Sequence, residues 1–544
     1  MLRRTLITCA AAASAAWLAS AAGAGEWWAP GDGRLLPAEA AYPNPHGALG
    51  ILNTAGAIDT RGHPFFEPLG ANGRGCVTCH QPSDGMALSV ATVRERWDST
   101  GGRDPLFAAS DGRNCPHLLA GDPSAHSLLL TRGLIRVALP WPPRDATGAP
   151  LPVELTLEVV RDPTGCNTHP TYGLESADPT VSVYRRPRPV ANTKYLTHNN
   201  FGVGPFIAKS GLPAVRDPDT GLPTSMNMMA DARATTLKAQ ALDAARTHLE
   251  RPQGLTPDEL RGIVAFEEQV YAAQARDALA GDLTSGPPGF GPRNLAAAPA
   301  GVLGNNTTRY VFPLGDAWQS PPQGTGASDE SAARAAIARG HDVFMFRTFF
   351  IRDSMHLNSV GLGNPVKRTC STCHGMHMTG MDVANGWMDI GTTNLPWARE
   401  APLNPWTAES PQLPLFKVTC NTHVAPHPFL GAVIYTQDPG RALVSGKCND
   451  VGAIVMQQFR GLAARAPYFS NGSAATLREL VDFYDRRYSI GYSEQEKRDL
   501  LARLVCNPRL EGRTVRYDLQ KHFAALAQMR GEGGWRPQRD SNPC

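Results

Sequence analysis

A five-residue motif with two cysteines and a histidine occurs twice in this chain, at residues 76–80 (CVTCH) and 370–374 (CSTCH). The spacing Cys-x-x-Cys-His places two thiols one helical turn apart, so that they form thioethers with the two vinyl groups of haem, and the adjacent histidine ligates the iron. Because the motifs lie far apart in the sequence, each is predicted to belong to its own helical haem domain. The residues predicted to bind two covalent haems c are Cys76, Cys79 and His80 at the first site and Cys370, Cys373 and His374 at the second, with His80 and His374 as iron ligands.

Two other kinds of site use a Cys-x-x-Cys pair. A structural zinc site would need a second such pair, or paired histidines, close by, and neither motif has them. A thioredoxin-like redox pair requires a βαβ context and has no trailing histidine. Haem attachment is therefore the interpretation that fits both motifs.

The first 24 residues have the features of an export signal. Arg3 and Arg4 give a positive start, residues 6–19 form a short apolar stretch, and residues 22–24 (Ala-Gly-Ala) match a small-x-small cleavage site. An N-terminal membrane anchor is the alternative, but the apolar stretch is short and no stop-transfer charges follow it. No other segment has the unbroken apolar length that spans a bilayer. We therefore predict a soluble periplasmic protein with no membrane span after signal cleavage.

The remaining cysteines predict disulfide bonds. Of 11 cysteines, Cys9 lies in the export signal and four lie in the two motifs. An exported chain folds in an oxidising compartment, where spare cysteines tend to pair. Six cysteines allow many connectivities, among which the order in the sequence suggests Cys115–Cys166, Cys420–Cys448 and Cys506–Cys544.

Length and composition set broader limits. A chain of 544 residues is too long for one ordinary core, which favours two domains. The contents of 42% hydrophobic and 19% charged residues are typical of a globular protein, and 53 glycines with 46 prolines predict much loop. A formal net charge of +3 is close to neutral at this size, so no nucleic acid is expected as a partner.

Hydrophobic periodicity predicts a mainly α fold. The two motifs add two c-type cytochrome haem domains to this prediction, with a small strand-containing insertion and long loops. Alternating apolar residues at 151–159 and 180–186 predict strands, which places the insertion near residues 140–190. The predicted boundaries are residues 1–24 for the signal peptide, 25–300 for the N-terminal haem domain, 301–335 for the linker and 336–544 for the C-terminal haem domain.

Helices are predicted at residues 256–274, about 328–346, 471–488 and 492–504. In the first of these, Thr256 is the N-cap, Glu259 completes a capping box, and Val270 falls on the apolar face. The last begins with a second capping box, formed by Ser493 and Glu496.

Two runs of sequence carry a resemblance to a known family. Residues 460–484 (RGLAARAPYFSNGSAATLRELVDFY) contain an APYF-x-NGS-x-x-TL pattern, and residues 228–250 (MMADARATTLKAQALDAARTHLE) contain an M-x-D-x-R…TL…QA pattern. In these runs the chain resembles the bacterial di-haem cytochrome c peroxidase and MauG superfamily, with its RoxA-like relatives, as a divergent member. The order of the two haem motifs and the two runs is also similar. The resemblance covers the haem regions and leaves out the strand-containing insertion.

The resemblance implies that the two haems have different roles. The first haem would react with peroxide at an open or exchangeable sixth position, and the second would pass electrons. Gln240 and Glu250 match the family's distal polar groups, and a carboxylate there can move a proton between the oxygens of peroxide. Tyr484 matches the sixth ligand of the second haem. The alternative is that all three are ordinary polar or packed helix residues, and the rival sixth ligands are His522, Met376, His377, Met378 and Met381.

The chain also departs from the family pattern. Ala230 stands where the family has a tryptophan between the haems, although Trp97 or Trp141 could supply an aromatic group. Ser470 replaces a histidine, and residues 454–461 lack a proline associated with an inter-haem calcium site, which leaves calcium doubtful.

The sequence is compatible with three functions. The first, which we favour, is a peroxidase-like or MauG-like oxidoreductase that takes electrons from a small redox protein or another donor through the second haem. The second is a RoxA-like haem oxygenase, and the third is a non-enzymatic periplasmic electron carrier with two six-coordinate haems. Axial ligands and distal polarity decide among them, and the sequence specifies only the proximal histidines.

Overall fold

The computed structural model describes residues 26–145, 147–197, 228–284, 290–297, 316–319, 328–354, 363–374, 387–394 and 410–506. All of them belong to one compact unit, Met1–Leu510, while a second unit, Glu511–Cys544, falls outside the described residues. The predicted signal peptide and most of the predicted linker also fall outside them. The proposed domain boundaries therefore stay a prediction.

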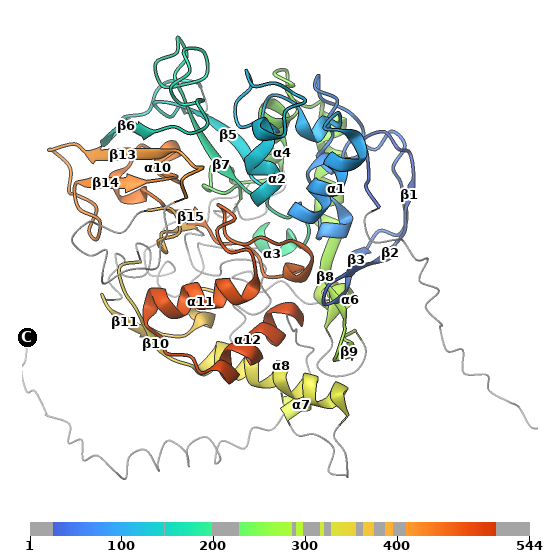
Figure 1. Ribbon diagram of the computed structural model, residues 1–544. Coiled ribbons are helices and arrows are strands. Elements are labelled where there is room, and N and C mark those ends of the chain that lie inside the picture. The colour runs from blue at the N-terminus through green and yellow to red at the C-terminus, as the bar shows by residue number, and fades with distance from the viewer. Residues whose placement is uncertain are drawn as a thin grey trace, which may run out of the picture. The chain divides into compact units, whose positions relative to one another are not determined.

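Six small sheets are present in the described part of the chain, so the prediction of a mainly α fold is wrong (Figure 1). The largest sheet is antiparallel and has the order β2 (Glu39–Asn44), β3 (Gly47–Asn53), β8 (Val270–Asp277) and β9 (Gly281–Asp282). Four further pairs of strands are antiparallel: β1 (Leu35–Leu36) with β4 (Ile58–Asp59), β5 (Ile135–Pro140) with β7 (Thr180–Arg185), β10 (Phe349–Ile351) with β11 (Val366–Arg368), and β12 (Trp387–Met388) with β15 (Ile454–Val455).

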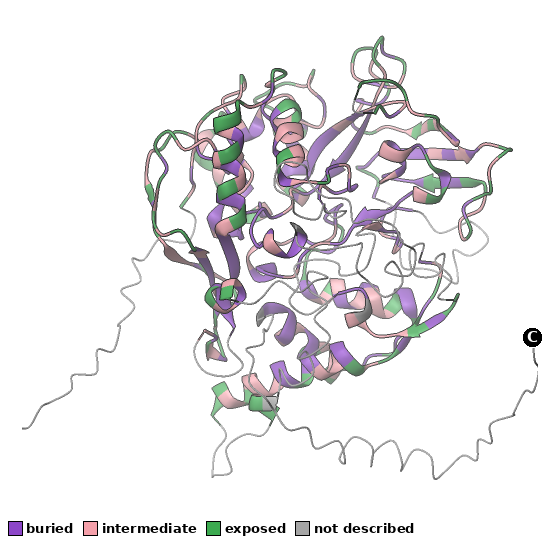
Figure 2. Cartoon of the chain, turned by 180° about the vertical axis from the view of Figure 1, so that it is seen from behind, coloured by how far each residue is buried: buried purple, intermediate pink, exposed green. Residues whose placement is uncertain are grey.

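Strand β8 shows why periodicity failed to reveal the sheets. Helix α5 (Pro257–Gln269) begins with the predicted capping box of Thr256 and Glu259, but it ends at Gln269, and Val270 opens β8 instead of continuing the helix. The first six residues of β8 are buried on both faces of the strand (Figure 2). A strand buried on both faces has no alternation of apolar and polar residues, so its sequence resembles a buried helix segment.

A three-stranded sheet joins the predicted insertion to the C-terminal half of the chain. Its order is β14 (Val433–Thr436), β13 (Leu415–Cys420) and β6 (Leu155–Arg161), with both pairings antiparallel. The ion pair between Lys417 and Glu158 crosses the β13–β6 pairing and joins residues 259 positions apart. The insertion was predicted correctly as strand-containing, but it does not form a sheet by itself.

Helices near the second motif match their predictions. The helix α8 (Asp329–Phe346) has Ser328 as its N-cap, and α11 (Leu477–Tyr488) and α12 (Glu494–Cys506) follow the APYF run. At Gly340 a Cβ atom would lie 1.9 Å from the carbonyl oxygen of Asp499, so only glycine permits α8 and α12 to approach this closely. The remaining helices are α1 (Val90–Thr100), α2 (Ser127–Arg132), α3 (Lys194–Thr197), α4 (Leu237–His248), α6 (Gly291–Ala297), α7 (Asp316–Gln319) and α10 (Ala442–Ser445).

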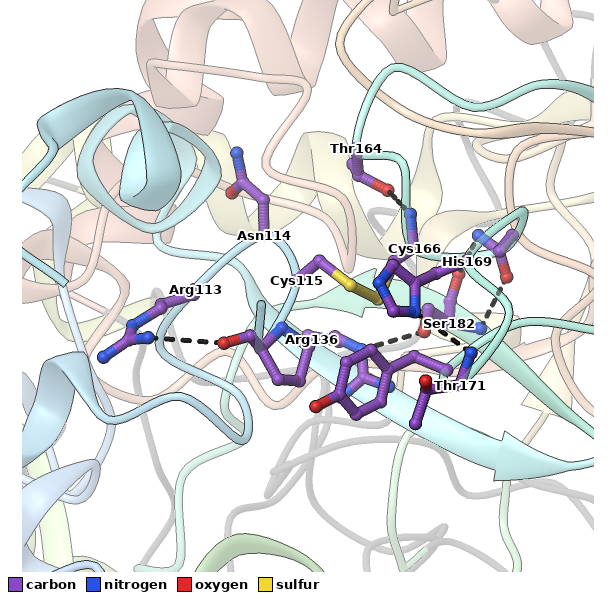
Figure 3. The surroundings of a disulfide bond; sticks show 12 residues. Arg113, Asn114, Cys115, Arg136, Thr164, Cys166, His169, Thr171 and Ser182 are labelled. Carbon is purple, nitrogen blue, oxygen red and sulfur yellow. Dashed lines mark hydrogen bonds between the residues drawn. A yellow bond between two sulfur atoms is a disulfide. The ribbon is translucent and has the colours of Figure 1, made fainter. Parts of the chain in front are cut away.

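Two of the three suggested disulfides are present, Cys115–Cys166 and Cys420–Cys448. Figure 3 shows the surroundings of the first, where Arg136 on β5 donates to the hydroxyl of Ser182 on β7. Cys544, the partner suggested for Cys506, lies outside the described residues.

Among the described helices, none is both long enough and apolar enough to cross a bilayer.

Candidate functional site

The first Cys-x-x-Cys-His motif forms a single tight turn. The 3-10 turn η1 (Cys76–Thr78) is continued by hydrogen bonds from the amides of Cys79 and His80 to the carbonyl of Cys76, both 3.2 Å long. The turn begins at Gly75, where a Cβ atom would lie 2.3 Å from the carbonyl oxygen of Glu67. Both cysteines are free thiols, and the turn brings them and the histidine to one side of a cavity.

The hydrogen bond of His80 leaves its Nε2 able to bind a metal. Its Nδ1 donates to the carbonyl oxygen of Met86 at 3.1 Å, and a carbonyl can only accept, so the Nε2 lone pair stays available. Burial lowers the pKa of His80 to about 4, which keeps the ring neutral. Burial also raises the pKa of the Cys79 thiol to about 11.

Helix α4 forms one wall of this first cavity. Its lining residues recur every three or four positions, which puts them on a single face of the helix: Leu237, Gln240, Ala241, Ala244, Ala245 and His248. Gln240 therefore lies at the cavity, while its predicted role beside a haem stays a prediction. Glu250 is exposed, has a positive φ of 52° just beyond the end of α4, and is not among the described residues that line the cavity.

Sequence reasoning missed His248 as a residue of this cavity. Its Nδ1 donates to Asp111 at 2.7 Å, and Asp111 in turn pairs with Arg74 at 3.0 Å. Asp111 and Arg74 are 2% and 1% exposed, so a buried ion pair orients the imidazole. These three residues come from separate segments of the chain, and no local motif could have brought them together.

Glu267 on α5 is a second unpredicted group at the first cavity. It is 2% exposed, and its Oε2 has no hydrogen-bond partner among the described residues. Burial, with a smaller effect of Glu268, raises the pKa of Glu267 to about 8. The cavity therefore holds a carboxyl group that stays mostly protonated at neutral pH.

The second motif repeats the geometry of the first. The amides of Cys373 and His374 donate to the carbonyl of Cys370 at 3.2 and 3.0 Å, which closes the turn η8 (Cys370–Thr372). Neither cysteine is in a disulfide bond, both line a second cavity, and the pKa of His374 is lowered to about 3 by burial and by Arg503. The ring of Phe459 packs against His374 with 4.4 Å between the ring centroids.

Tyr484 lines the second cavity together with His374. The two rings are 6.3 Å apart between centroids and nearly perpendicular, at 81°. Burial raises the pKa of Tyr484 well above its usual value. The structure therefore brings the predicted sixth ligand to the side of the proximal histidine. The rivals Met376, His377, Met378, Met381 and His522 lie outside the described residues.

Both cavities fit a haem in the chemistry of their linings. Each is lined mainly by apolar side chains, and each presents two thiols that are in no disulfide bond and a neutral imidazole from one turn, which are the groups that covalent haem attachment requires. Counted with the open space at the mouth, their empty volumes are about 1260 Å³ and 1410 Å³.

The two cavities lie on opposite sides of one thin partition. Arg186 and Pro187 line both of them. The amide of Val455, at the second cavity, donates to the carbonyl oxygen of Ala230, at the first, over 2.8 Å. We call this partition the shared wall and define it by Arg186, Pro187, Arg188, Ala230, Val455, Met456 and Arg465.

The shared wall contains no aromatic side chain, and among the described residues neither Trp97 nor Trp141 lines either cavity. Trp97 packs instead against Phe107 and His126, with 4.9 Å between ring centroids in each pair. At Ala230 the contact between the two sides is a backbone hydrogen bond.

A network of buried ion pairs lies next to the shared wall. Arg185 pairs with Asp231 at 2.5 Å and with Asp438 at 2.7 Å, and Arg233 pairs with Asp231 at 2.9 Å. Asp231 comes from the run that resembles the family, Arg185 from the end of β7, and Asp438 from the segment after β14. The network therefore links three segments that are distant from one another in the sequence.

No family model and no curated protein matches this chain. Among solved structures, the chain is similar to the crystal structure of a MauG-like protein associated with microbial copper homeostasis, with 14% sequence identity and a TM-score of 0.24. The match covers 58% of this chain and 87% of that protein. At that TM-score, neither the fold nor the role of any residue carries over to this chain.

Proposed function

We propose that this chain is an exported di-haem c-type cytochrome with peroxidase-like or MauG-like oxidoreductase activity. The observation that supports it best is that each Cys-x-x-Cys-His motif lines its own mainly apolar cavity and that the two cavities share one wall. Bound haem would supply the redox chemistry, because its iron exchanges electrons and reacts at an open coordination position.

The chain's own residues would hold and orient the two haems. Cys76 and Cys79 would fix the first haem, with Nε2 of His80 on its iron, and Cys370, Cys373 and His374 would do the same for the second. At the first cavity, Gln240 would place a polar amide beside the haem. At the second, the phenol oxygen of Tyr484 would help His374 to hold the iron, which suits a haem that only passes electrons.

Peroxide and carbon monoxide test this assignment on the intact protein. We expect hydrogen peroxide to change the absorption spectrum of one haem quickly, while the other serves as the electron source. After full reduction, carbon monoxide is expected to bind to one haem. Replacement of Gln240 by alanine should slow the peroxide-induced change, because it removes the polar side chain from the cavity. The matched control is Gln253→Ala, since Gln253 is exposed and lies outside the cavity.

Glu250→Gln in the same assay tests the proton transfer implied by the family resemblance. A slowing of about 10²–10⁴-fold, the usual contribution of an acid–base group, would assign the proton to Glu250. An unchanged rate would leave proton transfer to groups inside the cavity. Two low-spin haems that are inert to both peroxide and carbon monoxide would contradict the oxidoreductase proposal.

His248 supports a second candidate function, that of an electron carrier. An imidazole that donates Nδ1–H to a buried carboxylate resembles the arrangement common among metal-ligating histidines, with Nε2 left as an electron donor. If Nε2 of His248 occupied the sixth position of the first haem permanently, both haems would be six-coordinate. A ferric spectrum without a high-spin component would favour this function.

Tyr484→Phe is expected to change the spectrum and the midpoint potential of the second haem and to leave the first haem unchanged. The substitution removes the phenol oxygen that would ligate the iron and keeps the ring that packs near His374. Ferric absorption and electron paramagnetic resonance spectra measure the change. Tyr435→Phe is the control, because Tyr435 is 44% exposed and lies outside both cavities. Unchanged spectra for both haems would show that Tyr484 is only a packed helix residue.

A further inference from the structure

Three arginines of the shared wall are held without a carboxylate partner. Arg186 donates to the carbonyl oxygens of Arg465 and Leu88, at 2.8 and 2.6 Å. Arg188 donates to those of Val455 and Met456, and Arg465 donates to the carbonyl oxygen of Gln458. Within the described residues none of the three guanidinium groups forms an ion pair, so neutral carbonyl groups are their only acceptors there.

The neighbouring acids have other partners. Asp231 and Asp438 pair with Arg185, and Asp231 also pairs with Arg233. Asp84, which lies near Arg186, accepts hydrogen bonds from the amide of Ser89 and the hydroxyl of Thr92. Arg186 and Arg465 are 9% and 4% exposed, and each has a buried Nε–H with no acceptor in the part of the chain that the structure describes. A buried cation without a counterion is costly, since carbonyl groups replace only part of its hydration. The arrangement therefore fits an anion that binds in the cavities.

Burial acts on all three charges in the same direction. It lowers the pKa of Arg186 and Arg188 to about 10 and the pKa of Arg465 to about 9. For Arg186, the attraction of Asp84 opposes this effect only in part. The guanidinium groups stay charged at neutral pH, and a negative group placed beside them would be stabilised strongly.

The position of these arginines indicates which anion they would bind. Arg188 lines the first cavity, Arg465 lines the second, and Arg186 lines both. We propose that Arg186, Arg188 and Arg465 hold the carboxylates of the two haems across the shared wall, with Arg186 common to both. This inference rests on the proposed function, since haem is the group in each cavity that carries carboxylates. Arginine suits the task because its planar fork of donors matches a carboxylate in two-point contact.

Such contacts would link the redox properties of the two haems. A fixed positive charge beside a haem disfavours the ferric state, which carries one more positive charge than the ferrous state. Removal of an arginine should therefore shift the midpoint potential of the adjacent haem to more negative values. Because Arg186 faces both cavities, its removal should shift both potentials.

Spectroelectrochemical titration of the full-length mature protein tests this inference. Arg186→Gln is expected to shift both midpoint potentials to more negative values, Arg188→Gln mainly that of the first haem, and Arg465→Gln mainly that of the second. Arg186→Lys, which keeps the charge, should have midpoint potentials close to those of the wild type. Arg276→Gln is the matched control, since Arg276 is exposed and lies outside both cavities.

The outcomes separate this inference from the proposed function. If the wild-type protein carries no covalent haem, both fail. If it carries two haems and their potentials do not move in Arg186→Gln and Arg188→Gln, only the arginine assignment fails. Should Arg186→Gln not fold, Arg188→Gln and Arg465→Gln decide, because each predicts a shift confined mainly to one haem. Equal small shifts in these two variants and in the Arg276→Gln control would overturn the assignment.

Discussion

The purified protein with Cys370 and Cys373 changed to serine is expected to carry one covalent haem instead of two. A serine hydroxyl does not form the thioether that attaches haem, so the second cavity would lose its covalent link while the first keeps Cys76 and Cys79. Intact mass after acid extraction measures the effect, with two haem additions expected for the wild type. The reciprocal change at Cys76 and Cys79 should likewise leave one haem.

The control for this experiment is Cys506→Ser, which changes a cysteine outside both motifs. It should leave two haem additions. A wild-type protein with one haem or none after acid extraction would contradict the assignment of the motifs, and with it the proposed function.

Asp231→Asn is expected to destabilise the protein by about 3–5 kcal/mol, the usual cost of removing one partner from a buried ion pair. Asp231 is fully buried and pairs with Arg185, which is 2% exposed, and with Arg233. Asparagine would leave these two guanidinium groups with Asp438 and Asp243 only. The midpoint of urea unfolding of the mature protein, together with its slope, measures the loss.

The pH dependence of stability offers a second readout on Asp231. Burial opposes ionisation, but Arg233 and Arg185 outweigh it and lower the pKa of Asp231 to about 2. The stabilisation is therefore complete above the ordinary pKa of 3.8 and is lost as the pH falls toward 2. In Asp231→Asn this part of the acid transition should be absent.

Asp59→Asn is the control for both experiments on Asp231, because Asp59 pairs with Arg61 at the exposed surface, and little effect on unfolding is expected there. Equal effects of the two substitutions would contradict the proposed importance of the buried network.

Local signals in the sequence predicted local structure well. The capping box of Thr256 and Glu259 marked the start of α5, and alternation marked β7. The pairs Cys115–Cys166 and Cys420–Cys448 are confirmed. Each of these features depends on residues that are close in the sequence, or on cysteines whose pairing follows their order.

The sequence-based predictions were wrong or incomplete where tertiary contacts determine the structure. Val270 continues an apolar helical pattern, yet pairing with β3 makes it the first residue of a strand. The place of His248 at the first cavity depends on Asp111, and the shared wall brings Arg186 next to Arg465. No spacing rule connects such residues, because their proximity is a consequence of the fold and not of any segment. The family resemblance led to Gln240 and Glu250 but gave no sign of His248 or Glu267.

The pairing of β6 with β13 has a consequence for the order in which the chain can become native. Strand β6 belongs to the first half of the chain, while its partner β13 begins only at Leu415. Until that residue has been synthesised, this edge of β6 has no partner strand, and such edges favour pairing with other chains. A fragment that ends before β13 would contain the entire first haem motif and still lack the strand that covers this edge. Maturation of the first half therefore depends on the last third of the chain, and a truncated product would tend to aggregate.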